Sequence, residues 1–128
     1  MLGQNNHFRL YAKNMGHELQ YAVDRYSNET RRLYGVVEKR LTDRDWLAAG
    51  QYTIADMATF SWLRLNERFD IKLDEFPNIQ RWHDTIDARP AVTRGKDILV
   101  EYREKANAEL NPKEMQSNMF GKAQFAQR

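Results

Sequence analysis

The chain has 128 residues, of which 41% are hydrophobic and 30% charged, and it contains no cysteine. This composition is typical of one folded domain, and it excludes a disulfide framework, a thiolate zinc site and a cysteine nucleophile. The net charge of +2 lies entirely in residues 111–128, so the neutral remainder argues against nucleic acid as a partner. No apolar run is long enough to span a membrane and no signal peptide is visible. We therefore expect a cytoplasmic protein without membrane contact.

Helical periodicity dominates the chain, and strand signals are nearly absent, so the sequence predicts an all-α fold without a sheet. The first long helix is predicted over Glu18–Leu41. Its apolar residues recur at steps of three or four, as expected for one buried face: Leu19, Val23, Tyr26, Thr30, Leu33, Val37 and Leu41.

A connector over Thr42–Tyr52 follows, and its two large apolar residues, Trp46 and Leu47, predict that it folds back onto the core. Thr53 and Asp56 then have the spacing of a capping box, in which the Thr53 side chain accepts from a first-turn amide and the Asp56 side chain reaches back to the Thr53 amide. The helix that they open is rich in apolar residues, which predicts a central, buried helix. One face is expected to hold Ile54, Ala58, Ser61, Leu65 and Phe69. Four more residues widen this apolar stripe: Met57, Phe60, Trp62 and Leu63.

The next helix is predicted to begin at Phe76-Pro77 and to end at Arg89, because the residue before a proline disfavours helix. Its inner face should hold Ile79, Trp82, His83 and Ile86. Pro90 opens a further helix, which carries Val92, Leu99, Tyr102, Ala106 and Leu110. These elements give about five helices over residues 1–110, followed by a mobile polar tail over residues 111–128.

The common catalytic motifs are absent: there is no phosphate-binding glycine loop, no G-x-S-x-G and no H-E-x-x-H. His7, His17 and His83 are too far apart in sequence to suggest metal ligands on one helix, so no metal site is predicted. Arg25 has Glu29 four residues further on, a spacing that permits an ion pair on the helix surface. The residues alone leave open whether Arg25 is a surface ion-pair residue or a ligand-binding residue.

Four segments together resemble the C-terminal domain of glutathione transferases. They are residues 24–37 (DRYSNETRRLYGVV), Gly3–Phe8 (GQNNHF), Trp46-Leu47 with residues 52–56 (YTIAD), and Ala88–Val92 (ARPAV). The first two resemble most closely the class that contains the fungal nitrogen regulator with prion properties and bacterial Nu-class relatives. The resemblance covers about residues 1–100 and implies the helical bundle of that domain.

The resemblance also implies a ligand. Arg25 would face the glutathione site, and Asn5, His7 and Phe8 would lie along the cleft that the helical domain forms with a thioredoxin-like domain. That second domain, which holds most glutathione contacts in the family, is expected to be absent from this chain. We therefore assign no catalytic residue and no tightly bound cofactor, with glutathione as a cosubstrate.

Three functions remain open at this stage. The first is an enzyme of the glutathione transferase type, which conjugates glutathione to electrophilic small molecules or reduces disulfides with it. The second is a non-catalytic interaction or regulatory module of the same fold, and the third is a decayed copy without activity. A homodimer or a thioredoxin-like partner is expected to cover an apolar patch near Phe8 and Tyr11.

Overall fold

The computed structural model describes residues 1–98, 100, 104 and 117–125. Every regular element in these ranges is helical and none is a strand, which confirms the all-α prediction. The chain divides into two compact units, Met1–Val92 and Thr93–Arg128. In the second unit the structure describes the end of α5 (Pro90–Asp97), a helical turn over residues 117–120 and the 3₁₀ helix η4 (Lys122–Phe125).

Part of the predicted C-terminal region lies outside the described residues. This holds for residues 111–116 and 126–128 of the predicted mobile tail and for four apolar positions of the last predicted helix: Leu99, Tyr102, Ala106 and Leu110. Pro90 does open a helix, and Val92 near its start packs against the core. The extent of the helical domain up to residue 110 stays a prediction.

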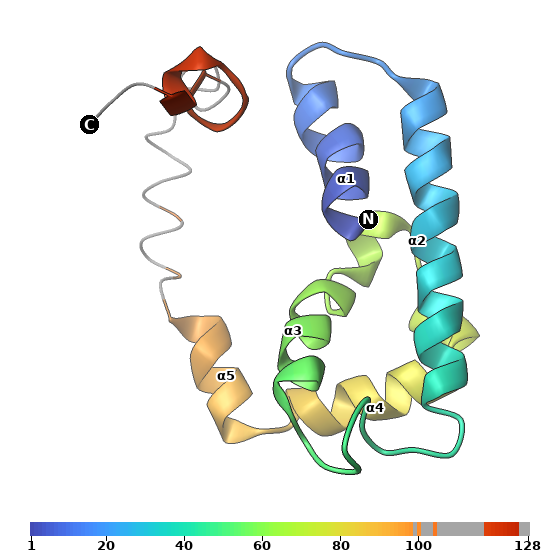
Figure 1. Ribbon diagram of the computed structural model, residues 1–128. Coiled ribbons are helices and arrows are strands. Elements are labelled where there is room, and N and C mark those ends of the chain that lie inside the picture. The colour runs from blue at the N-terminus through green and yellow to red at the C-terminus, as the bar shows by residue number, and fades with distance from the viewer. Residues whose placement is uncertain (99, 101–103, 105–116, 126–128) are drawn as a thin grey trace. The chain divides into compact units, whose positions relative to one another are not determined.

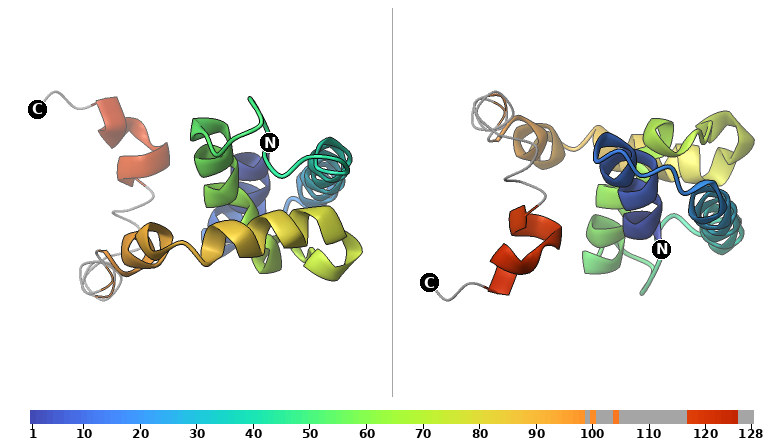
Figure 2. Two further views of the ribbon diagram at one scale, coloured as in Figure 1. Left: turned by 90° about the horizontal axis from the view of Figure 1, so that it is seen from below. Right: turned by 90° about the horizontal axis from the view of Figure 1, so that it is seen from above.

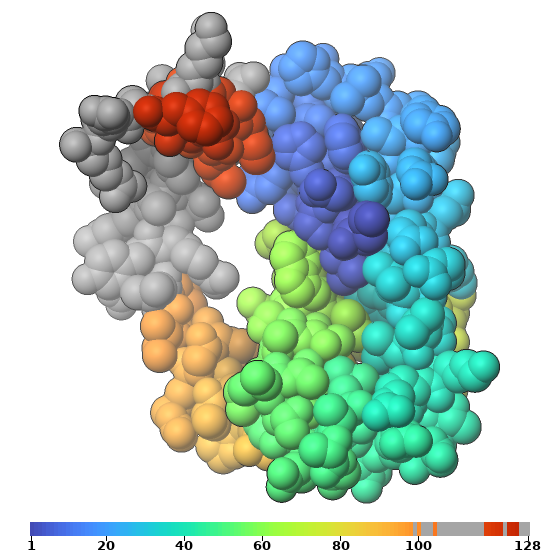
Figure 3. Space-filling model, in the orientation of Figure 1, coloured from blue at the N-terminus to red at the C-terminus, as the bar shows by residue number. Residues whose placement is uncertain are grey.

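The first unit begins with two antiparallel helices that lie side by side (Figure 1). The first runs as α1 (Leu2–Asn6) and continues without a break into η1 (His7–Ala12), which has the wider π-helical winding. The second is α2 (Gln20–Arg40), two residues shorter at its start than predicted. Figure 3 shows the side chains of these two segments in direct contact along the face in view.

The buried residues of α2 only partly match the predicted face. Thr30 and Leu41 are buried as expected, but Leu19 at the helix start is 49% exposed. Tyr34, which the periodicity does not select, is wholly buried, and its hydroxyl donates to the Leu63 carbonyl oxygen at 3.1 Å. Burial raises the pKa of Tyr34, so its hydroxyl stays protonated and able to donate.

The predicted apolar stripe of the third helix, α3 (Ile54–Leu63), is only partly right. The buried residues are Asp56, Phe60 and Leu63, whereas Ile54 is 82% exposed. Phe69, which the prediction placed on this helix, lies in the separate 3₁₀ helix η2 (Asn66–Phe69). Because α3 is apolar around its whole circumference, the hydrophobic pattern does not determine which side faces the core.

The last helix of this unit, α4 (Pro77–Asp87), follows the 3₁₀ helix η3 (Leu73–Glu75). It lies across the ends of α2 and α3, as the views of Figure 2 show. Three residues of its predicted inner face are wholly buried: Ile79, Trp82 and Ile86. Trp46 and Leu47 pack against the same core, as predicted for the connector.

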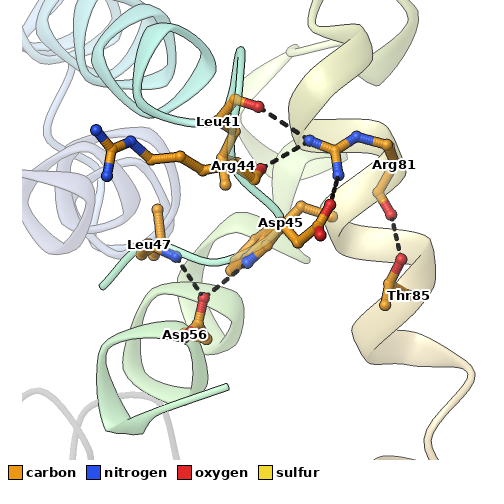
Figure 4. A network of polar contacts seen from close by, with 8 residues as sticks. Leu41, Arg44, Asp45, Leu47, Asp56, Arg81 and Thr85 are labelled. Atoms are coloured by element: carbon orange, nitrogen blue, oxygen red, sulfur yellow. Dashed lines mark hydrogen bonds and ion pairs between the residues drawn. The ribbon is translucent and has the colours of Figure 1, made fainter. Parts of the chain in front are cut away.

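A buried polar network joins the connector, α3 and α4 (Figure 4). The capping box is present: the Thr53 amide donates to Asp56 Oδ2 at 2.9 Å, and Thr53 Oγ1 accepts from the Ala55 amide at 3.3 Å. Asp56 Oδ1 also accepts from the Leu47 amide and from the Trp82 indole, both at 2.9 Å. One carboxylate therefore fixes the connector, the start of α3 and the middle of α4.

Candidate functional site

One face of α2 forms a depression of about 530 Å³. Arg25 lines this depression, and so does Met1 at the start of α1. The other lining residues all come from α2: Tyr21, Asp24, Tyr26, Asn28, Glu29 and Arg32. Helical geometry explains the grouping, because positions three, four and seven apart share one face of a helix.

Arg25 is exposed, and its side chain makes no hydrogen bond or ion pair with any of the residues that the structure describes. The ion pair with Glu29 that its spacing permits does not form. Glu29 instead accepts from Arg32 Nε and Nη2 at 2.8 and 2.9 Å. This hydrogen bond with Arg32 lowers the pKa of Glu29, and the more distant charge of Arg25 contributes to the same effect. The guanidinium of Arg25 is therefore available to a ligand.

Asn5 lies inside the helix pair and not on its surface. Its side chain is wholly buried, which prevents direct contact with a ligand in this structure. Asn5 Nδ2 donates to Thr30 Oγ1 at 2.9 Å, and Asn5 Oδ1 accepts from Ser27 Oγ at 3.3 Å. Both partners belong to the part of α2 whose outer side carries Arg25.

His7 and Phe8 lie on η1, and neither of them lines the depression around Arg25. Phe8 stacks on Tyr26 of α2 with ring centroids 5.3 Å apart, and its ring also meets the edge of His7 at 5.0 Å. Phe8 and Tyr11 are both half-buried, whereas Leu10 between them is 40% exposed. The apolar patch expected near Phe8 and Tyr11 stays a prediction. Phe8 lines a second depression of about 480 Å³, which Arg9, Lys13 and His17 also line.

The chemistry available around Arg25 is that of binding. A guanidinium presents several donors in a planar fork that matches a carboxylate, and the Asn28 amide lies one helical turn away. Sequence reasoning selected Arg25 but missed Tyr21, Asn28 and Arg32. Their spacing of three, four or seven residues from Arg25 is a signal that could have identified them.

Two features bear on other kinds of site. The described residues contain no group of three or more histidine and acidic side chains arranged to hold a metal ion. None of the helices that the structure describes is long and apolar enough to cross a bilayer.

Comparisons with known proteins identify relatives of the chain. The family model for the glutathione S-transferase C-terminal domain matches residues 7–90. The chain is 43% identical over 91 residues to the disulfide-bond oxidoreductase YfcG of Escherichia coli, which covers 71% of this chain and 41% of that protein. It is 38% identical over 103 residues to glutathione S-transferase 1 of Schizosaccharomyces pombe, with 70% and 44% covered. The chain thus spans less than half the length of these relatives.

Solved structures agree with these sequence matches. Ure2p in complex with glutathione superimposes with a TM-score of 0.65 at 36% identity, covering 73% of this chain and 46% of Ure2p. A glutathione transferase of Burkholderia graminis, with two glutathione molecules bound per subunit, gives a TM-score of 0.65 at 40% identity. That match covers 76% of this chain and 42% of the transferase.

Proposed function

Because the chain belongs to the glutathione S-transferase family through its C-terminal domain, we propose that it binds glutathione in the depression beside Arg25. In this proposal Arg25 holds a carboxylate of the tripeptide, and the activity served is glutathione conjugation or glutathione-dependent disulfide reduction. A cytoplasmic location is part of the proposal, because that compartment maintains a reducing glutathione pool.

The observation that carries the proposal is the unpaired guanidinium of Arg25 in an open depression. Arg32 is neutralised by its bonds to Glu29, whereas Arg25 has no such partner among the described residues. Charge-assisted bonds between arginine and carboxylate are shorter and stronger than neutral hydrogen bonds. Two structural relatives with 36% and 40% identity bind glutathione, which supports the same ligand class here.

The experiment is calorimetric titration of the chain with reduced and with oxidised glutathione. We expect binding in the millimolar range, and we expect Arg25→Ala to weaken it about tenfold, the loss of one charge-assisted contact. The glutathione affinity of Arg25→Lys should lie between those of the parent protein and Arg25→Ala, because an ammonium keeps the charge but lacks the bidentate fork.

Arg64→Ala is the matched control. Arg64 is also an exposed arginine whose side chain makes no hydrogen bond or ion pair with the described residues, so its replacement removes the same charge at another surface. Equal affinity in the wild-type and Arg25→Ala proteins, or an equal loss in both alanine variants, would contradict a role for Arg25.

The assembly that we propose includes a second protein surface, either a thioredoxin-like domain or a second copy of the chain. Exposed apolar side chains on α3 support it, namely Ile54, Met57 and Trp62. Exposed large apolar residues that gather on one element mark interaction surfaces. Sedimentation over a range of concentrations tests the homodimer, and a monomer at every concentration would exclude that form.

A further inference from the structure

We propose that Asn5 is a positioning residue, which fixes α1 against α2 and thereby shapes the depression in which Arg25 lies. The effect on glutathione binding rests on the proposed function. The fixing of α1 against α2 is argued from the contacts of Asn5 alone. Asn5 is wholly buried, and buried amides that lack partners are costly, so its hydrogen bonds constrain how the two helices meet.

The contacts of Asn5 reach α2 at two points. Thr30 accepts from the Asn5 amide nitrogen at 2.9 Å, and Ser27 donates to the Asn5 amide oxygen at 3.3 Å. Because Ser27 and Thr30 lie three residues apart, they present adjacent bonding groups on one side of α2. Two directional bonds to residues one helical turn apart fix both the rotation of α1 about its axis and its displacement along α2. Apolar contacts alone do not specify either of these.

The network continues beyond Asn5. Ser27 Oγ also accepts from Arg9 Nη1 at 3.3 Å, and Arg9 forms an ion pair with Asp70. The path from Asp70 through Arg9 and Ser27 to Asn5 connects the segment after η2 to the contact between α1 and α2. The position of α1 is therefore tied to a third element of the fold.

Asn5 is linked to the depression on both of its sides. The backbone N–H of Asn5 donates to the Met1 carbonyl oxygen at 3.1 Å within the helix, and Met1 belongs to the lining of the depression. Ser27 and Thr30 are close in sequence to Arg25 and Asn28, which line the same depression from α2. A change in how α1 sits on α2 thus moves one wall of the depression relative to the other.

The test uses variants that preserve volume. Asn5→Leu removes both side-chain hydrogen bonds of Asn5, and Thr30→Val removes the bond between Asn5 and Thr30. The double variant replaces this pair by apolar groups of similar shape. Replacing both partners of a buried hydrogen bond costs much less stability than replacing one. We therefore expect the double variant to be more stable than Asn5→Leu. Its glutathione affinity should nevertheless stay about fivefold below that of the parent protein, measured at a temperature where every variant is folded.

A second readout is independent of any ligand. Because the chain has no cysteine, nitroxide labels attach cleanly to Lys13→Cys at the end of η1 and to Lys39→Cys on α2. We expect a narrow distribution of label distances in the parent protein and a shifted or broadened one with Asn5→Leu. Gln4→Leu, at an exposed neighbouring position of α1, is the control and should leave both readouts unchanged.

The outcomes separate the two proposals. If the parent protein does not bind glutathione, the proposed function fails, and the label distances alone decide the role of Asn5. Unchanged distances in folded Asn5→Leu overturn the positioning role. If glutathione binds but its affinity changes only in proportion to the stability of each variant, the positioning role of Asn5 is also overturned. Altered distances together with an affinity loss that persists in the double variant support it.

Discussion

At the scale of single residues, Asp56 has the most consequential side chain of the described core. It is wholly buried and accepts hydrogen bonds from Leu47, from Trp82 and from both the amide and the hydroxyl of Thr53. Burial alone would raise the pKa of this carboxyl, but the hydrogen bonds outweigh it and lower the pKa. Asp56 is therefore a charged group that the interior stabilises.

The first prediction is that Asp56→Ala lowers the free energy of unfolding by about 3 kcal/mol. The loss of the cap costs about 1 kcal/mol, and the buried Leu47 amide and Trp82 indole left without partners account for the rest. Urea unfolding followed by circular dichroism measures the change. Asp74→Ala, at an exposed position, should leave the midpoint nearly unchanged, and equal midpoints for both variants would contradict the prediction.

The second prediction concerns acid. Because the pKa of Asp56 is lower in the folded protein than its ordinary value of 3.8, the unfolded chain binds protons more readily at low pH. The stabilisation is complete above the ordinary pKa and is lost as pH falls through the folded pKa. Urea midpoints measured between about pH 5 and pH 2.5 should fall less steeply in Asp56→Asn than in the wild type. If the urea midpoints of both proteins fell equally with pH, Asp56 would not be the source of this acid sensitivity.

At the scale of elements, α4 receives its N-terminal cap from another helix. Phe76 at the N-cap position makes no side-chain cap. Instead, Glu38 of α2 accepts from the amides of Asn78 and Ile79 at 3.1 and 2.9 Å, and from the Asn78 side chain at 2.7 Å. The carboxylate also suits the partial positive charge of a helix N-terminus. This cap joins α2 to α4.

The third prediction follows from that cap. Glu38→Ala should destabilise the protein by about 2 kcal/mol, because two helix-terminal amides lose their acceptor and the helix dipole loses a favourable charge. The stability of Glu38→Gln, which keeps an acceptor without the charge, should lie between those of the wild type and Glu38→Ala. Thermal and urea unfolding measure both variants. Glu67→Ala, at an exposed glutamate, is the control, and a Glu38→Ala variant as stable as this control would show that the cap is dispensable.

At the scale of the whole molecule, the described residues around Arg25 suit binding better than catalysis. Conjugation requires a stabilised thiolate, and preorganised donors aimed at the developing charge supply most of such rate enhancements. The depression instead carries charges of both signs, with Asp24 and Glu29 beside Arg25 and Arg32, so it offers no concentrated positive field that would stabilise a thiolate. An arginine that holds one end of glutathione does not activate the thiol at the other.

The fourth prediction is that the 128-residue chain by itself does not accelerate the conjugation of glutathione with 1-chloro-2,4-dinitrobenzene above the uncatalysed rate. Absorbance of the conjugate measures the rate, and chain-free buffer gives the baseline. A turnover that Arg25→Ala abolishes would contradict this prediction and would place a catalytic site within these residues.

Much of the fold could be predicted from the sequence because its signals are local. Proline at the starts of α4 and α5, the Thr53 and Asp56 spacing, and the regular apolar steps of α2 each depend on neighbours within one or two helical turns. The same holds for the choice of Arg25, which came from a resemblance in contiguous sequence. These local signals determined the helical class, the order of the helices and the membership of the family.

Tertiary structure alone decided which face of α3 is buried and which polar side chains far apart in sequence become partners. On α3 the apolar pattern covers every side, so contacts between Asp56 and the distant Trp82 select the buried face. Asn5 lies inside because its partners Ser27 and Thr30 are brought to it by the antiparallel pairing of α1 and α2. Sequence spacing does not reveal such partners, since bonds between residues far apart in the chain depend on how whole elements pack.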